Sequence, residues 1–332
     1  MKKWYLHIIL WVSVSVPTLV EAQDHVPSQF WRSFILNNPA NTALIQEDYR
    51  AFTSYRNQWS SVNSPFKTML AAGEAKLRKG NFSYFGVGAT VLNDKAGDSQ
   101  LGLFQANLSF AYHMRIGSKD GLSAGIAAGY MQRSINIDGL EWDSQFNGVG
   151  VDPTLASGES FGNQQSSAID VSAGMHWSHD KVRRYDLGIA IWHYGQASGF
   201  LDNSIEKTLP RYVGNFVWYE DFGPVGARFQ ALYTQQGGAM QVVVGGTGRY
   251  RVGADSRFTS ARTSNAIIGG IHYRYQDAIL VNLGYEYRRQ YEIGLSYDFT
   301  TSNLARNNQG RGGFEITLSW KGWYVDRRIR VR

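Results

Sequence analysis

Apolar and polar residues alternate with a period of two along much of this sequence. Even positions from Phe104 to Met114 carry F, A, L, F, Y and M, whereas odd positions from Gln105 to Arg115 carry Q, N, S, A, H and R. Only a β-strand places alternate residues on opposite faces. The same alternation recurs in residues 165–178, 278–289, 291–301 and 312–322. The pattern predicts a chain built of long strands.

Extending the pattern along the chain predicts fourteen strands. They lie at 49–59, 67–79, 82–93, 101–116, 122–137, 165–178, 184–196, 208–221, 225–235, 239–252, 264–275, 278–289, 291–301 and 312–322. Many reach the ~9–11 residues that a tilted strand needs to cross a bilayer. In lipid, only a closed set of strands satisfies its own backbone hydrogen bonds. The predicted fold class is all-β, a transmembrane antiparallel β-barrel of about 14 strands.

The connections between these strands support a barrel, because outer-membrane barrels have short periplasmic turns and longer extracellular loops. With a periplasmic N-terminus, short inner turns are expected at 80–81, 117–121, 179–183, 222–224 and 290. Longer outer connections are expected at 94–100, 138–164, 197–207 and 302–311, whereas the inner connection 253–263 is long. Both termini are therefore predicted to lie in the periplasm.

The composition excludes a disordered, collagen-like or coiled-coil chain. Aromatic residues make up 14% of the chain and charged residues 18%, below the roughly 25% of an average soluble domain. Because charges facing hydrocarbon are costly, polar strand residues are expected in the lumen. We expect ten residues to face lipid: Phe104, Leu108, Phe110, Val171, Met175, Val281, Leu283, Leu295, Ile316 and Leu318. We expect seven to face the lumen: Asn107, Asp170, His176, Glu286, Glu292, Asp298 and Glu315.

The first 22 residues have the features of a secretory signal peptide. Lys2 and Lys3 precede an apolar run that extends to Val16, and Val20-Glu21-Ala22 provides a cleavage site. We therefore expect a cleaved signal and residence in the cell outer membrane. The expected domains are the signal peptide at 1–22, an N-terminal periplasmic or plug segment at 23–48, the barrel at 49–323 and a basic tail at 324–332.

Two motifs have spacings known from enzymes, but neither has the structural context that the chemistry needs. Residues 121–125 fit G-x-S-x-G, whose serine must stand between a strand and a helix, whereas Ser123 enters a predicted strand. His176 and His179 are three residues apart, which on a strand places them on opposite faces. The chain has no cysteine to serve as nucleophile or ligand. We expect no catalytic, cofactor-binding or metal-binding residues, no cofactor and no enzyme activity.

The N-terminal segment 23–48 is rich in apolar side chains. It contains Phe30, Trp31 and Phe34, an apolar set too large to leave in water. The segment is expected either to contact a partner or to fold into the barrel as a plug. These three residues are candidate partner-binding residues.

The connection 138–164 is far longer than a closing turn requires. It places Trp142, Phe146 and Phe161 among Gly, Ser and Asp, a composition typical of a loop that binds through a few aromatic anchors. These residues complete the set of candidate partner-binding residues. The mild formal charge of +6 gives no reason to expect nucleic acid as a partner.

Several short blocks form a pattern that extends over nearly the whole chain beyond the signal. They are Gln23-Asp24, Ser28-Gln29-Phe30, Asn38-Pro39-Ala40, Tyr55-Arg56-Asn57-Gln58-Trp59, Pro65-Phe66-Lys67-Thr68, Ala111-Tyr112-His113-Met114-Arg115-Ile116, Ile293-Gly294-Leu295-Ser296-Tyr297-Asp298-Phe299 and Phe314-Glu315-Ile316-Thr317-Leu318-Ser319-Trp320. Together they resemble the PorP/SprF family. The resemblance implies an outer-membrane component of the type IX secretion system, which exports surface proteins and in some bacteria supports gliding motility. It implies as partners the other components of that system, a secreted adhesin-like surface protein and outer-membrane lipid.

A second class of function stays open at this point, namely an outer-membrane diffusion channel or small-ligand transporter. Fourteen strands lie between the 8 whose lumen side chains fill and the 16–18 that leave an aqueous pore, so strand number does not decide. A barrel hydrolase would depend on Ser123 alone. Steady conductance in a planar bilayer would favour the channel, whereas copurification with a large secreted protein would favour a role in secretion.

Overall fold

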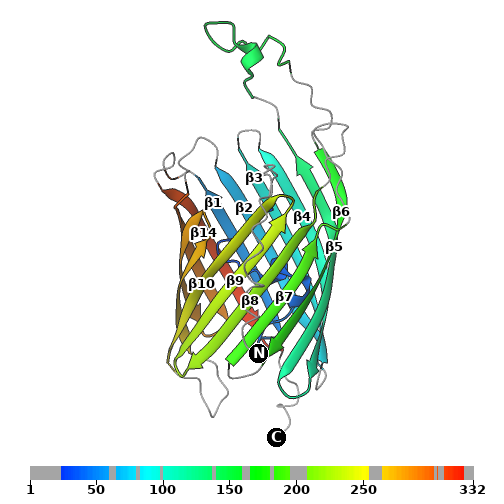
Figure 1. The fold of residues 1–332 in the computed structure, drawn as a ribbon, viewed down its shortest axis with the longest axis vertical. Helices are drawn as coiled ribbons and strands as arrows, with labels where there is room; N and C mark the ends of the chain where they lie inside the picture. The colour runs from blue at the N-terminus through cyan, green and yellow to red at the C-terminus, as the bar shows by residue number, and fades with distance from the viewer. Residues whose placement is uncertain are drawn as a thin grey trace, which may run out of the picture.

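The computed structural model describes residues 24–59, 65–79, 83–97, 100–136, 140–158, 165–179, 183–194, 208–253, 264–302, 305 and 310–324. Fourteen antiparallel strands form a closed barrel in which each strand pairs with its neighbours in sequence and β1 pairs with β14 (Figure 1). The strands are β1 (Tyr49–Gln58), β2 (Phe66–Lys79), β3 (Ser83–Ala96), β4 (Leu101–Ile116), β5 (Asp120–Ser134), β6 (Gln165–His179), β7 (Arg183–Trp192), β8 (Arg211–Phe222), β9 (Val225–Gln236), β10 (Ala239–Val252), β11 (Asn265–Arg274), β12 (Ala278–Tyr287), β13 (Tyr291–Thr300) and β14 (Arg311–Gly322). The predicted fold class is confirmed. Among the described residues, no helix is long and apolar enough to cross a membrane.

The strands follow the predicted ranges closely, and the largest difference lies at the end of β7. The alternation predicts this strand to residue 196, but it ends at Trp192. The next residue, His193, has a φ of 62°, a left-handed conformation that does not continue a strand. Its ring contacts Asp24 of the N-terminal segment. The regular strand therefore ends at His193, whose side chain makes a tertiary contact.

The two ends of the barrel differ in their connections. One end, here called the turn end, holds the start of β1 at Tyr49 and the end of β14 at Gly322, with short turns at 117–119, 223–224 and 288–290. The opposite end, the loop end, holds the connection 135–164, of which residues 140–158 project far beyond the barrel (Figure 1). The predicted long inner connection 253–263 lies, except for Gly253, outside the described residues.

Each strand turns one face to the lumen and the other outward, as its period of two requires. Leu108 and Leu283 expose 72% and 63% of their surface, whereas Asp170 and Glu315 expose 4% and 1%. All ten residues predicted to face lipid are exposed or half-buried, and the seven predicted to face the lumen are buried, with Glu292 half-buried. Both predicted sets are confirmed.

Residues 24–48, here called the plug, lie inside the barrel (Figure 1). The plug contains a short helix α1 (Phe34–Asn37) and a 3₁₀ turn η1 (Pro39–Asn41). Near the loop end, the Asp24 N–H donates to Gln236 Oε1 at 2.8 Å. Near the turn end, the Asp48 N–H donates to the Gly322 carbonyl at 2.8 Å. The plug therefore extends along the lumen from one end of the barrel to the other.

Candidate functional site

Inward-facing glycines allow the plug to approach the barrel wall closely. An added Cβ at Gly125 of β5 would lie 2.5 Å from the carbonyl carbon of Pro39 and 2.6 Å from the Ala40 nitrogen. At Gly88 of β3, it would lie 2.5 Å from Ile35 Cδ1. Backbone cannot move aside for a side chain at Gly125, so this position requires glycine as long as the plug occupies the lumen, whereas at Gly88 the end of the Ile35 side chain would have to shift.

Asn38 ties the turn of the plug to the sheet through backbone carbonyls. Its Nδ2 donates to the carbonyls of Met175 at 2.9 Å and Ile189 at 3.1 Å. Its Oδ1 accepts from the Ala40 N–H at 2.8 Å, which caps η1. One buried side chain therefore satisfies both the local turn and two neighbouring strands.

Two buried carboxylates hold the start of the plug. The Ser28 N–H donates to Glu315 Oε2 at 2.7 Å, and the Ser28 hydroxyl donates to Asp298 Oδ2 at 2.8 Å. The guanidiniums of Arg56 and Arg274 lie 2.7 and 3.1 Å from the same Asp298 oxygen. Because buried charges need partners, this cluster fixes the plug and four strands, β1, β11, β13 and β14, in one arrangement.

A second charged cluster lies near the turn end. Arg32 of the plug pairs with Glu292 of β13. Lys321 Nζ of β14 lies 3.4 Å from Glu292 and 2.7 Å from Glu286. Arg249 of β10 also pairs with Glu286. The plug is thereby part of a charge network that joins β10, β12, β13 and β14.

The start of the plug is also bound at the loop end, by His193. Its Nε2 lies 2.5 Å from Asp24 Oδ2 and its Nδ1 lies 3.1 Å from Asp170 Oδ1. Burial alone would lower the pKa of His193, but the two carboxylates outweigh burial and raise the pKa to about 9. Burial would raise the pKa of Asp24, yet His193 and Arg211 hold it well below its usual range. Both charged forms are therefore favoured in the folded protein.

The aromatic residues of the plug pack into the barrel wall. Trp31 stacks on the imidazole of His272 with ring centroids 4.3 Å apart, and Phe30 meets the same ring edge-on at 5.6 Å. Phe30 and Trp31 expose 2% and 6% of their surface, and Phe34 is half-buried against the same cluster. The expectation that these three residues bind an external partner does not fit this burial, because the barrel wall covers the surface that a partner would contact.

The part of the long connection at 140–158 folds back on itself. Phe146 and Val151 form an antiparallel bridge. Gln145 holds both sides, because its Oε1 accepts from the Trp142 N–H at 3.2 Å and its Nε2 donates to the Leu155 carbonyl at 3.0 Å. We call residues 140–158 the loop head. These bonds give it a defined shape of its own.

The loop head displays apolar side chains. Phe146 exposes 58% of its surface, Val149 exposes 96% and Leu155 exposes 42%, whereas Trp142 is half-buried. Phe161, the third aromatic residue predicted in this connection, lies outside the described residues. Trp142 and Phe146 both belong to the loop head, which lies beyond the end of the barrel, whereas the plug lies inside the barrel (Figure 1).

The two enzyme-like motifs take part in barrel contacts. The Ser123 hydroxyl lies 2.7 Å from His113 Nδ1, and His113 Nε2 lies 2.8 Å from the carbonyl of Thr42 in the plug. His176 is buried. His179 is the last residue of β6, and its Nδ1 lies 2.7 Å from Oδ1 of Asp120 in β5. In the part of the chain that the structure describes, no group of three or more His, Cys, Asp or Glu residues could hold a metal ion.

The fold and the luminal site define a membrane β-barrel of the outer-membrane type with an internal N-terminal plug. Residues 19–320 match the family described as type IX secretion system membrane protein PorP/SprF, and the chain belongs to this family. Membership implies interaction with other components of that secretion system. A comparison with curated protein sequences gave no match.

Solved structures of other outer-membrane proteins share the fold. The toluene transporter TbuX of Ralstonia pickettii matches with a TM-score of 0.51 and 13% identity over 87% of this chain and 93% of that chain. A FadL homologue of Pseudomonas aeruginosa gives 0.51 and 12% over 87% and 94%, and the monoaromatic hydrocarbon channel CymD gives 0.52 and 12% over 88% and 93%. At such identities the likeness shows the fold alone, so it does not favour a channel function for this chain.

Proposed function

We propose that this protein assists the secretion or surface attachment of an adhesin-like partner protein through the type IX secretion system, and that it supports gliding where the cell glides. Membership in the PorP/SprF family supports the assignment to that system. In this proposal the loop end faces the cell exterior, because long connections of outer-membrane barrels are extracellular. A cleaved signal peptide at 1–22 directs the chain to the membrane.

The observation that carries the proposal is the loop head. It has its own hydrogen-bonded shape, extends beyond the barrel and exposes Phe146, Val149 and Leu155. The connection 138–164 holds five acidic residues and no Lys, Arg or His, although the whole chain has a formal charge of +6. An acidic surface with apolar anchors suits a protein partner that has an apolar site bordered by basic residues.

The plug supports a protein partner over a diffusible solute. All residues from Val26 to Ala43 except Phe34 are buried inside the barrel. Their contacts with glycines, carboxylates and histidines of the wall occupy space that a water-filled channel would need. A role at the surface of the barrel therefore fits the structure better than flow through it.

The experiment compares surface display of the secreted partner in cells that carry altered loop heads. One variant replaces residues 142–161 by a short Gly-Ser linker, and a second carries Phe146→Ala with Leu155→Ala. The matched control is Tyr194→Ala, which removes another aromatic residue at the loop end that exposes 71% of its surface. Barrel assembly is measured by heat-modifiable migration, and display by surface labelling.

We expect normal assembly of every variant, loss of display in both loop-head variants and normal display in the control. The secreted partner should copurify with the wild-type protein and the control, but not with either loop-head variant. Full display by the linker variant would overturn the proposed role of the loop head. Steady conductance of the purified wild-type protein in a planar bilayer would favour the channel instead.

A further inference from the structure

Small residues form part of the outward face of β1, β2 and β3. The strand register places Ala51 opposite Gly73 and Gly73 opposite Ala89, so these three residues make one row across the sheet. The next row on the same face places Ala71 between Thr53 and Val91. Because these side chains are small, the outer surface is recessed over these three strands.

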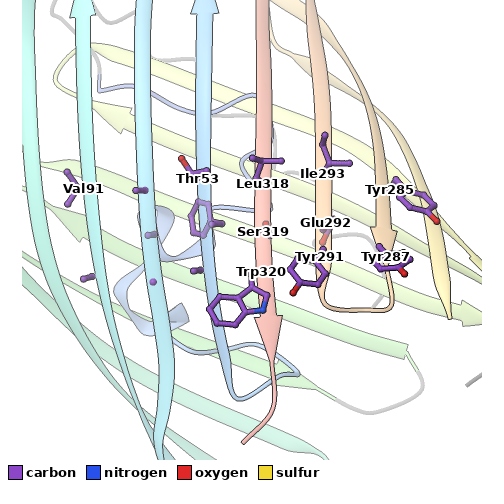
Figure 2. Close-up of a pocket in the computed structure, with 16 residues that line it drawn as sticks. Thr53, Val91, Tyr285, Tyr287, Tyr291, Glu292, Ile293, Leu318, Ser319 and Trp320 are labelled. Atoms are coloured by element: carbon purple, nitrogen blue, oxygen red, sulfur yellow. The ribbon is translucent and has the colours of Figure 1, made fainter. Parts of the chain in front are cut away.

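The same rows continue as large side chains on the next three strands. Trp320 of β14 is paired with Ala51, Tyr291 of β13 with Trp320, and Tyr287 of β12 with Tyr291. Figure 2 shows Trp320, Tyr291 and Tyr287 side by side on these strands, with Val91 at the opposite edge. The change in side-chain size between β1 and β14 creates an outward-facing groove of about 700 Å³.

An aromatic cluster that includes the groove residue Trp320 lies on the turn-end side of the groove. The ring of Tyr49 lies edge-on to Trp320 with centroids 5.2 Å apart, and the ring of Tyr324 lies 5.9 Å from Tyr49. Tyr and Trp at the ends of barrel strands lie at the level of the lipid headgroups. The groove therefore extends from one headgroup region toward the centre of the bilayer.

A cation lies beside this end of the groove. Arg288, in the turn between β12 and β13, is exposed, and its guanidinium carbon lies 5.1 Å from the centroid of the Tyr287 ring, which lines the groove. Guanidinium binds phosphate oxygens through paired hydrogen bonds. An apolar groove in the hydrocarbon region with a cation at headgroup level matches the two parts of a phospholipid.

We propose that this groove binds one phospholipid from the leaflet at the turn end of the barrel. An acyl chain lies over Ala51, Gly73 and Ala71 beside Trp320, and the phosphate lies at Arg288. Charge complementarity favours a lipid over a protein segment, because the groove is lined by apolar side chains along its length and has a cation, Arg288, at its end. This site is independent of the loop head and of the secretion role.

The test uses the full-length protein in nanodiscs made of phosphatidylcholine and phosphatidylglycerol, followed by native mass spectrometry after release into mild detergent. The groove variant Ala71→Phe with Ala89→Phe fills the recessed surface. The variant Arg288→Gln removes the cation and leaves the groove. The matched control Ala128→Phe adds a phenyl ring at an exposed outward position of β5, away from the groove. Heat-modifiable migration confirms that each variant is folded.

We expect wild type and the control to retain one phospholipid, and the groove variant to retain about tenfold less, since the chain loses contact with several methylenes. The preference of Arg288→Gln for phosphatidylglycerol over phosphatidylcholine should fall about fivefold, as loss of one interfacial cation predicts. Unchanged lipid retention in the groove variant would overturn the proposal. A photo-crosslinker at Val91 in cells should label lipid, and a crosslinked protein would assign the groove to a protein partner instead.

Discussion

Arg56 of β1 and Asp298 of β13 form a buried ion pair, with Arg56 Nη2 2.7 Å from Asp298 Oδ2. The same oxygen accepts the hydroxyl of Ser28 at 2.8 Å and lies 3.1 Å from Arg274 Nη2. One carboxylate thus joins the plug to β1, β11 and β13. The plug is therefore held by the charges that stabilise the barrel itself.

Replacing Asp298 by Ala should leave two buried guanidiniums without their shared partner. Removal of one side of a buried ion pair costs about 3–5 kcal/mol, because the remaining charge stays desolvated. We expect a loss of this size in the free energy of unfolding, measured by denaturant titration in liposomes. Asp152→Ala on the loop head serves as control and should change it by less than about 0.5 kcal/mol. Equal stability of the two variants would show that the Asp298 cluster does not hold the barrel.

Gly125→Ala should displace the plug while the barrel still closes. The new methyl would lie 2.5 Å from the Pro39 carbonyl carbon, and backbone cannot give way as a flexible side chain can. The expected cost is about 1–3 kcal/mol. Trypsin cleavage after Arg32, a buried residue in the wild type, reports the displacement. Gly269→Ala, where an added Cβ meets nothing within 4 Å, is the control and should stay resistant. Resistance of both variants would argue against tight contact at Gly125.

The bond between His193 and Asp24 predicts a pH dependence. The folded pKa of His193 is about 9, above its usual 6.5, so its contribution to stability is complete below pH 6.5 and is lost as pH rises through 9. The pKa of Asp24 is lowered, so its contribution is present above pH 3.8 and is lost in stronger acid. The contact between His193 and Asp24 should therefore contribute most to stability between pH 3.8 and pH 6.5.

The measurement compares wild type with His193→Asn in denaturant titrations from pH 6 to pH 10. The difference in the free energy of unfolding should shrink by about 3 kcal/mol across this range, as the shift in the His193 pKa requires. A difference that stays constant from pH 6 to pH 10 would contradict the assignment of a charged His193.

Leu295→Arg should destabilise the barrel, because this outward residue exposes 41% of its surface toward lipid. An Arg near the bilayer midplane of a barrel costs about 2–4 kcal/mol. Folding into liposomes, followed by denaturant titration, measures this loss. The control is Val149→Arg on the loop head, where the native side chain is 96% exposed and no loss is expected. A negligible change for Leu295→Arg would mean that the position does not face hydrocarbon.

The barrel could be predicted from sequence because its determinants are local. Leu295 and Asp298 face opposite ways because a strand has a period of two, and that period can be counted in the chain itself. The end of β7 could not be predicted in this way. The alternation continues past Trp192, whereas the strand ends at His193, which has a positive φ and binds Asp24, a residue 169 positions away.

The luminal site was predictable only in part. Phe30 and Trp31 indicate that the N-terminal segment needs cover, but not whether a partner or the barrel supplies it. In the sequence, Gly125 cannot be distinguished from any other glycine in a strand. Its requirement for glycine becomes apparent only from the position of the plug backbone at Pro39 and Ala40. Asn38 did stand in a recognisable block, Asn38-Pro39-Ala40, which the structure explains as a capped turn bound to two strands.

The plug is bound by the same strand that closes the barrel. The Ser28 N–H reaches Glu315 across 287 positions, and the strand that carries Glu315 is also the one that closes the barrel against β1. Contacts so distant in sequence close a long loop, which carries an entropic cost. A chain truncated before β14 would lack the strand that pairs with β1 and would also lack Glu315, which binds the plug. The strand that closes the barrel therefore also completes the binding site of the plug.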